Sequence, residues 1–106
     1  MTAAPSRWDR LAADLAAAGI PISIDSKSYA EAAYGRIQRG VSRSVTIRLR
    51  DGYIVHIRDQ WWRKNLDVWV GWVVSVDASN GLVARTWTAT KKRSQVVTAM
   101  REAVRL

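Results

Sequence analysis

The chain has no cysteine and no phenylalanine, and its 106 residues include only one histidine and two prolines. The absence of cysteine excludes disulfides, thiol nucleophiles and thiolate metal sites. The nine acidic residues lack both the spacing of metal ligands and the pairing of catalytic carboxylates, and no glycine-rich phosphate loop is present. We therefore predict no catalytic residue, no metal site and no cofactor.

Long apolar runs are also missing. The longest, at residues 68–76, contains Gly71 and Ser75 and is too short to cross a bilayer as a helix. The first residues lack the apolar segment of a signal peptide. A composition of 48% hydrophobic and 25% charged residues is typical of a globular protein. These features predict a single domain over residues 1–106, a cytoplasmic location and no membrane partner.

Tryptophan, by contrast, is abundant. The chain has six, and five of them lie between Trp61 and Trp87. An indole either buries a large apolar area, with an N–H group that needs an acceptor, or stands exposed as a stacking surface for a ligand. The role of each tryptophan is therefore the central question for function.

Positive charge is concentrated in two segments of this chain of net charge +8. Residues 41–65 carry six Lys or Arg against two acids, and residues 91–106 carry five against one, so each segment has a net charge of +4. Residues 1–40 have a net charge of +1 and residues 66–90 a net charge of −1. A clustered basic surface is typical of proteins with polyanion partners. Alternatively, arginine covers the surface because of a base-composition bias in the genome.

The N-terminal part reads as helix and short strand. Ser6 can cap a helix at about residues 7–18, and Gly19 can end it. Its apolar positions, which follow helical spacing, are Trp8, Leu11, Leu15 and Ala18. Alternating isoleucines at residues 20–24 then suggest a short strand, which Pro21 would place at an edge of the sheet.

A second helix is expected after that strand. Ser28 and Glu31 form a capping-box pattern, and Gly40 can end the helix. Gly35 in the middle weakens this helix by about 1 kcal/mol relative to alanine.

Residues 45–57 form a predicted β-hairpin. A three-residue loop at 50–52, with Gly52 in the left-handed region, makes one face wholly apolar because it pairs Val45 with Ile57, Ile47 with Val55 and Leu49 with Tyr53. The other face is then basic and carries Ser44, Thr46, Arg48, Ile54, His56 and Arg58.

Two further strands are predicted at residues 66–76 and 82–90. Alternation in the first places Val68, Val70, Trp72, Val74 and Val76 on the core face, and Trp69, Gly71, Val73 and Ser75 on the outer face. For the second, a five-residue loop at 77–81 puts Trp87 on the outer face opposite Gly71 and beside Arg85. This is the favoured register, whereas a tight Asn80–Gly81 turn sets Trp87 against Val74 in the core.

A C-terminal helix is predicted at about residues 92–104. Lys91, Lys92 and Arg93 place three cations at the positive end of its dipole, which is unfavourable unless an anion binds there. Alternatively, this is a solvated basic turn before a helix capped by Thr90 or Ser94. The predicted fold class is α+β: a four-stranded antiparallel meander with the N-terminal helices and the C-terminal helix packed on one face.

The connection after the hairpin extends the basic surface. By strand parity Trp61 continues the core side, whereas Trp62 continues the outer side next to Arg63 and Lys64. Arginine and lysine that neutralise phosphates, together with a stacking tryptophan, are typical of nucleic-acid binding. We therefore predict binding of nucleic acid, DNA rather than RNA, by Arg48, Arg50, His56, Arg58, Trp62, Arg63, Lys64, Arg85, Lys91, Lys92 and Arg93.

The second half of the chain also resembles known DNA-binding domains. Strand W-V-V-S-V, turn D-A-S-N-G, strand V-A-R-T-W-T-A-T-K-K and a helix are similar to the arm-type DNA-binding domains of phage integrases and to plant ethylene-response-factor-type domains. In those families a three-stranded antiparallel sheet lies in the DNA groove. The resemblance, which covers about a third of the chain, implies DNA contacts from Arg48, Arg58, Arg85 and either Trp69 or Trp87.

Two other functions fit the sequence. Trp69, Val73 and Trp87 on the outer face are an alternative interface with a second subunit or a partner protein, as in an inhibitor of phage origin. Small basic proteins of this layout also resemble the ribonuclease toxins of bacterial toxin–antitoxin pairs. Arg48, His56, Arg58 and Arg101 would then be the candidate residues for RNA cleavage.

Overall fold

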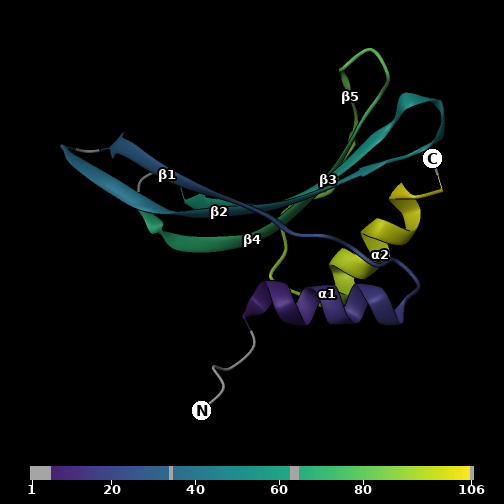
Figure 1. Cartoon of the computed structure of the whole chain (residues 1–106), viewed down its shortest axis with the longest axis horizontal. Coiled ribbons are helices and arrows are strands. Elements are labelled where there is room, and N and C mark those ends of the chain that lie inside the picture. Colours follow the sequence, from purple (N-terminus) through teal and green to yellow (C-terminus); the bar gives the residue numbers. More distant parts are fainter. Residues whose placement is uncertain (1–5, 34, 63–64, 106) are drawn as a thin grey trace.

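The chain folds into an antiparallel sheet with one helix at each end of the sequence (Figure 1). The computed structural model describes residues 6–33, 35–62 and 65–105, with the backbone alone at residues 29, 31–33, 36–40, 62 and 65–67. The elements are α1 (Arg7–Ala17), β1 (Asp25–Ala33), β2 (Arg36–Arg48), a 3-10 turn η1 (Arg50–Gly52), β3 (Ile54–Trp62), β4 (Asn65–Asp77), β5 (Val83–Thr86) and α2 (Arg93–Ala103). None of the described helices has the length and hydropathy needed to cross a membrane.

The predicted α+β class and antiparallel meander are confirmed. The strands follow one another in the order β1-β2-β3-β4-β5, and both helices lie on the same face of the sheet (Figure 1). The predicted number of strands is wrong, because the sheet has five rather than four. The prediction of two N-terminal helices is also wrong, since α1 alone precedes the described sheet.

Residues 25–48 account for both errors. The segment predicted as a second helix forms the hairpin of β1 and β2, in which Ser28 pairs with Val41 and Ala33 with Arg36. Gly35 has a φ of 78°, which suits a tight hairpin turn and not a right-handed helix. Residues 20–24, predicted as a strand, pair with no described strand, and their three isoleucines pack against the core instead.

The β2–β3 hairpin has the predicted register. Val45 pairs with Ile57 and Ile47 with Val55, while the Leu49 amide donates to the Tyr53 carbonyl at 2.8 Å. Gly52 has the expected positive φ, 79°, and Asp51 also enters the left-handed region at 63°. Because residues of alternate parity point to opposite faces, this register separates one buried row from one polar row.

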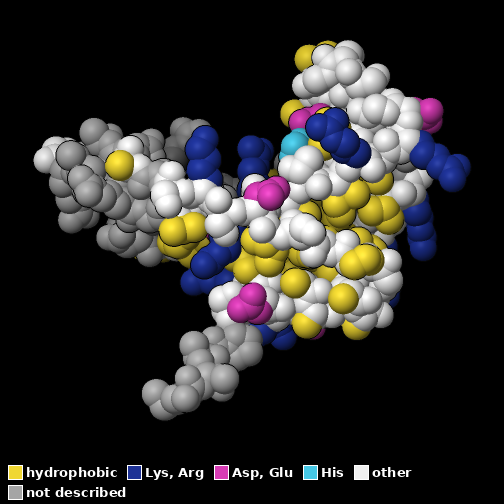
Figure 2. Space-filling model, viewed as in Figure 1, with side chains coloured by type: hydrophobic (Ala, Val, Ile, Leu, Met, Phe, Trp, Pro, Cys, Tyr) yellow, Lys and Arg dark blue, Asp and Glu magenta, His cyan; other side chains and the backbone are white. Residues whose placement is uncertain are grey.

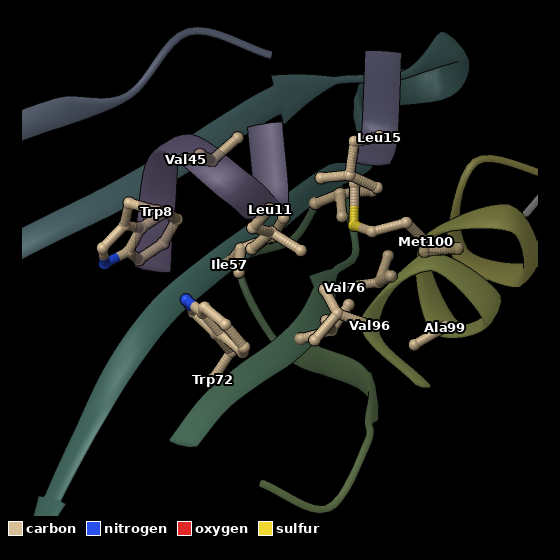
Figure 3. Packing of buried hydrophobic residues seen from close by; sticks show 13 residues of the cluster. Trp8, Leu11, Leu15, Val45, Ile57, Trp72, Val76, Val96, Ala99 and Met100 are labelled. Carbon is tan, nitrogen blue, oxygen red and sulfur yellow. The ribbon is translucent and has the colours of Figure 1, made fainter. Parts of the chain in front are cut away.

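The core lies between the sheet and the two helices (Figure 3). It contains Trp8, Leu11 and Leu15 from α1, Val45, Val55, Ile57, Trp72, Val74 and Val76 from the sheet, and Val96, Ala99, Met100 and Ala103 from α2. Trp72 makes edge-to-face contacts with Trp8 and Trp69, at ring-centroid distances of 6.2 and 4.8 Å. Its buried Nε1 has no hydrogen-bond partner among the described residues.

A β-bulge reverses the side-chain parity within β4. Gln60 pairs with Gly71, but the next residue of β3, Trp61, pairs with Trp69, so one residue of β4 is left over. Before the bulge, Trp69 therefore shares the core side with Trp72, and its predicted place on the outer face is wrong. Val68, predicted in the core, is 40% exposed for the same reason.

Trp87 also lies on the core side, against the favoured register. Its amide donates to the Val74 carbonyl at 2.9 Å, which is the alternative considered for a tighter β4–β5 connection. A register shift between Val76 and Asp77 allows this pairing despite a loop that runs through residues 78–82. The indole of Trp87 packs against the core and faces α2.

Candidate functional site

The face of the sheet opposite the helices carries a continuous polar row. Thr46 pairs with His56, His56 with Ser75, and Ser75 with Thr86, so these four side chains lie next to each other across β2, β3, β4 and β5. Thr46, His56 and Ser75 alternate with core residues along their strands, whereas Thr86 lies on the exposed strand β5. No described helix covers this side, which we call the uncovered face.

His56 is held from two sides within this row. Its Nε2 lies 3.1 Å from Oδ2 of Asp77, and its Nδ1 lies 3.4 Å from Oγ1 of Thr46. Both His56 and Asp77 have about a third of their side chains exposed, at 31% and 29%. Asp77 is thus placed to orient the ring, while the ring remains accessible to a ligand.

Arg58 lies next to this row and separates two hollows. One, of about 240 Å³, is lined by Arg58, His56 and Ser75 together with Thr86 from β5. The other, of about 380 Å³, is lined by Arg58, Asp59, Gln60, Trp61 and Val73. Arg58 therefore lines two neighbouring depressions that could hold parts of an extended ligand.

Arg48 and Arg50 extend the positive charge toward the β2–β3 turn. Arg48 has the same strand parity as Thr46, so it lies on the uncovered face, and Arg50 is exposed in η1. Among the described residues, Arg48, Arg50 and Arg58 have no carboxylate within 4.0 Å. Their charges are available to an external anion.

Arg85 and Arg93, by contrast, are engaged inside the protein. Arg85 donates to Oε2 of Glu102 at 3.0 Å and stacks over the ring of Trp87, while Arg93 donates to Oδ2 of Asp14 at 2.8 Å. Both partner acids belong to helices, so the two arginines lie in the helix layer. The structure does not bring them together with Arg48, His56 and Arg58.

Lys91 and Lys92 are exposed at the start of α2. Lys92 occupies the N-cap position without a side-chain cap, and its amide donates instead to Oγ1 of Thr90 at 3.1 Å. Thr90 also hydrogen-bonds to Gln95. This basic turn directly precedes Arg93. The contact of Arg93 with α1 places Arg93 on the side of the sheet opposite the uncovered face.

The three residues of the alternative protein interface do not share a surface. Trp69 and Trp87 pack against the core from the helix side, and their Nε1 atoms donate to Asp59 and Glu102 at 2.9 and 3.0 Å. Val73 lies on the uncovered face with 9% exposed. The prediction that they form one exposed face is wrong.

The candidates for RNA cleavage are likewise divided between the two sides. Arg48, His56 and Arg58 lie on the uncovered face, whereas Arg101 is exposed on α2. Trp61, predicted in the core, is half-buried and lines two hollows. The side chains of Trp62, Arg63 and Lys64 lie outside the described residues.

Two polar residues of the uncovered face are not among the predicted site residues. The sequence predicts Ser75 on the outer face without a role in binding, and it is 4% exposed within the polar row. The sequence predicts Asp77 in a loop, but Asp77 belongs to β4 and pairs with Ile54 of β3. Strand parity continued by two residues beyond Ser75 would have placed Asp77 beside His56.

Comparisons with known proteins find no relatives. No protein-family model matches the chain, and neither a curated protein nor a solved structure matches it. The fold also differs from what the resemblance to integrase and ethylene-response-factor domains implies, since five strands stand in place of three. Of the contacts that this resemblance implies, Arg48 and Arg58 alone lie on the uncovered face.

Proposed function

We propose that the chain binds nucleic acid, and DNA in preference to RNA, through the uncovered face of the sheet. The observation that carries this proposal is the cross-strand row of Thr46, His56, Ser75 and Thr86, flanked by Arg48 and Arg58, neither of which has an acidic partner among the described residues.

The chemistry of this face suits a phosphate backbone. Guanidinium groups donate paired hydrogen bonds to phosphate oxygens, and hydroxyls supply further donors. Asp77 is the acid nearest to the row, and its contact with His56 directs its carboxylate to the imidazole ring. A net charge of +8 adds a long-range attraction that increases the rate of encounter with a polyanion.

Binding through phosphate contacts must weaken steeply with salt, because each contact releases counterions. The experiment is fluorescence anisotropy of a labelled DNA duplex over a range of salt concentrations, with Arg48→Gln and Arg58→Gln variants. Each substitution should reduce affinity and flatten the slope of log K against log salt by about one unit.

Arg101→Gln is the matched control, because Arg101 is exposed on α2 in the helix layer. It removes the same charge from the other side of the sheet and should leave the slope unchanged. The proposal fails if the protein does not raise the anisotropy of any duplex at low salt. It also fails if Arg101→Gln weakens binding as much as Arg58→Gln. Tighter binding of an RNA duplex of equal length would correct the preference for DNA and leave the face unchanged.

A further inference from the structure

A separate hollow of about 450 Å³ opens on the helix side of the sheet, between the start of α1 and strands β2 and β3. Its walls include Arg7 and Trp8 from α1, Arg43 from β2, and Asp59 and Trp61 from β3. The volume is within the range of sites that bind small molecules. Arg7, Trp8 and Arg43 lie on the opposite side of the sheet from Arg48 and the polar row, and Asp59 and Trp61 are shared with the hollow beside Arg58.

Two arginines give the hollow its charge. The guanidinium carbon of Arg7 lies 3.8 Å from the centroid of the Trp69 ring, so the group stacks on the indole. A stacked guanidinium keeps its N–H donors in its own plane, where they remain free to bind an anion. Arg43 is half-buried in the wall formed by β2. Neither arginine has a carboxylate within 4.0 Å among the described residues.

Asp59, the acid in this hollow, is occupied by indole donors. Its Oδ1 accepts hydrogen bonds from Nε1 of Trp8 at 3.0 Å and from Nε1 of Trp69 at 2.9 Å, and Oδ2 also lies 3.0 Å from Trp8. The carboxylate is therefore held by neutral donors and does not pair with the arginines. Two guanidinium groups against one carboxylate leave the hollow with a net positive charge.

Trp61 supplies a flat apolar wall. Its side chain is half-buried, so part of the indole surface is accessible from the hollow. The other two indoles nearby offer no surface for stacking, because Trp8 is 1% exposed and Trp69 is covered by Arg7. The hollow thus combines one free stacking surface with two free cations.

We propose that this hollow binds a nucleoside monophosphate group. The phosphate accepts hydrogen bonds from Arg7 and Arg43, and the base stacks on Trp61. A free nucleotide and the 5′-phosphorylated end of a nucleic-acid strand present this same chemistry. The site goes beyond the proposed binding of duplex DNA and does not depend on it.

Calorimetric titration with adenosine monophosphate, adenosine and inorganic phosphate tests the proposal. We expect the monophosphate to bind at least about 10-fold more tightly than either of its two parts, because each part uses only one half of the site. Arg7→Gln and Arg43→Gln should each weaken the monophosphate by about 10-fold or more, since each removes a charge-assisted hydrogen bond.

Arg48→Gln is the control, because Arg48 lines neither this hollow nor the one that shares Trp61 with it, and it should leave the monophosphate affinity unchanged while weakening the DNA duplex. Arg7→Gln should do the reverse, so failure of this site and failure of the uncovered face give different results. The indole N–H signals in an NMR spectrum add a second readout, because the monophosphate should shift the Trp61 signal most. Equal affinities for phosphate and the monophosphate, or a loss caused by Arg48→Gln alone, would overturn the proposal.

A competition experiment distinguishes the two sources of the ligand. Displacement of the monophosphate by a 5′-phosphorylated oligonucleotide, but not by its 5′-hydroxyl form, assigns the site to strand ends. Displacement by neither assigns it to free nucleotides. Equal displacement by both would contradict the requirement for a terminal phosphate.

Discussion

Asp59 connects parts of the chain that are far apart in sequence, because one carboxylate accepts hydrogen bonds from two tryptophans. Trp8 lies 51 positions before it and Trp69 lies ten positions after it. Nothing in the sequence marks this residue, since strand parity places it on the core side, where an acid is unfavourable without partners. The indole N–H groups are the partners, and they explain why an acid is tolerated there.

Asp59→Ala should destabilise the protein by about 1–3 kcal/mol, because both indole donors lose their acceptor in a partly buried place. Asp59→Asn should recover much of this loss, since its amide oxygen can still accept a hydrogen bond. Urea unfolding measures both variants. Equal stabilities of the two variants would show that these hydrogen bonds contribute little.

At the scale of elements, the hydrophobic pattern of the sequence predicted helices and strands correctly where one register alone gave an apolar face. The register of the β2–β3 hairpin was predicted correctly for that reason, and the bounds of α1 and α2 within one residue, although β2 begins at Arg36 rather than at the predicted Val45. Residues 28–40 were wrongly predicted as a helix, because their spacing and capping pattern suit a helix as well as strands. Only the pairing of β1 with β2 decides between helix and hairpin. The bulge at Val70 was equally hidden, since the unpaired residue has no sequence signature except the neighbouring Gly71.

Gly71 also permits a close contact between β4 and the segment before α2. Its φ is 134°, and a Cβ atom there would lie 2.6 Å from the carbonyl oxygen of Thr90, which accepts a hydrogen bond from the Trp72 amide. A side chain at this position would therefore force apart two backbone segments.

Gly71→Ala should cost about 3 kcal/mol or more, because it adds a backbone clash to an unfavourable φ. Gly81→Ala is the control: its φ is 83°, but a Cβ atom there would meet nothing within 4 Å, so about 1 kcal/mol is expected. Thermal unfolding of the two variants measures the difference. Similar losses would mean that the connection to α2 moves aside at little cost.

At the scale of the whole molecule, the cations of the two basic segments do not form one surface. Arg48 and Arg58 lie on the uncovered face, whereas Arg43, from the same segment, and Arg93 lie on the helix side. Figure 2 shows one face of the molecule, with dark-blue side chains in several separate places and apolar side chains gathered toward the end where the helices lie. The sequence predicted one combined site because charge along a chain does not reveal which side of a sheet each residue occupies. Arg48, His56 and Arg58 were predicted together correctly, since they share one hairpin face.

This separation predicts that Lys91 and Lys92 contribute little to binding at the uncovered face. A Lys91→Gln, Lys92→Gln double variant should change the salt slope for a DNA duplex by much less than the two units expected for Arg48→Gln with Arg58→Gln. Both double variants remove two charges, so a general effect of net charge cancels. If the lysine variant flattened the slope more, the duplex would contact the start of α2 instead.

The contact between Trp8 and Asp59 has a consequence for how the chain folds as it is synthesised. Among the described elements α1 is synthesised first, but its apolar side packs against β3, β4 and finally α2, the last described element. Trp8, Leu11 and Leu15 therefore stay uncovered until the sheet and α2 have been synthesised. Docking of α1 is thus a late step that completes the native state, and shortened chains that end before α2 should expose this surface to chaperones.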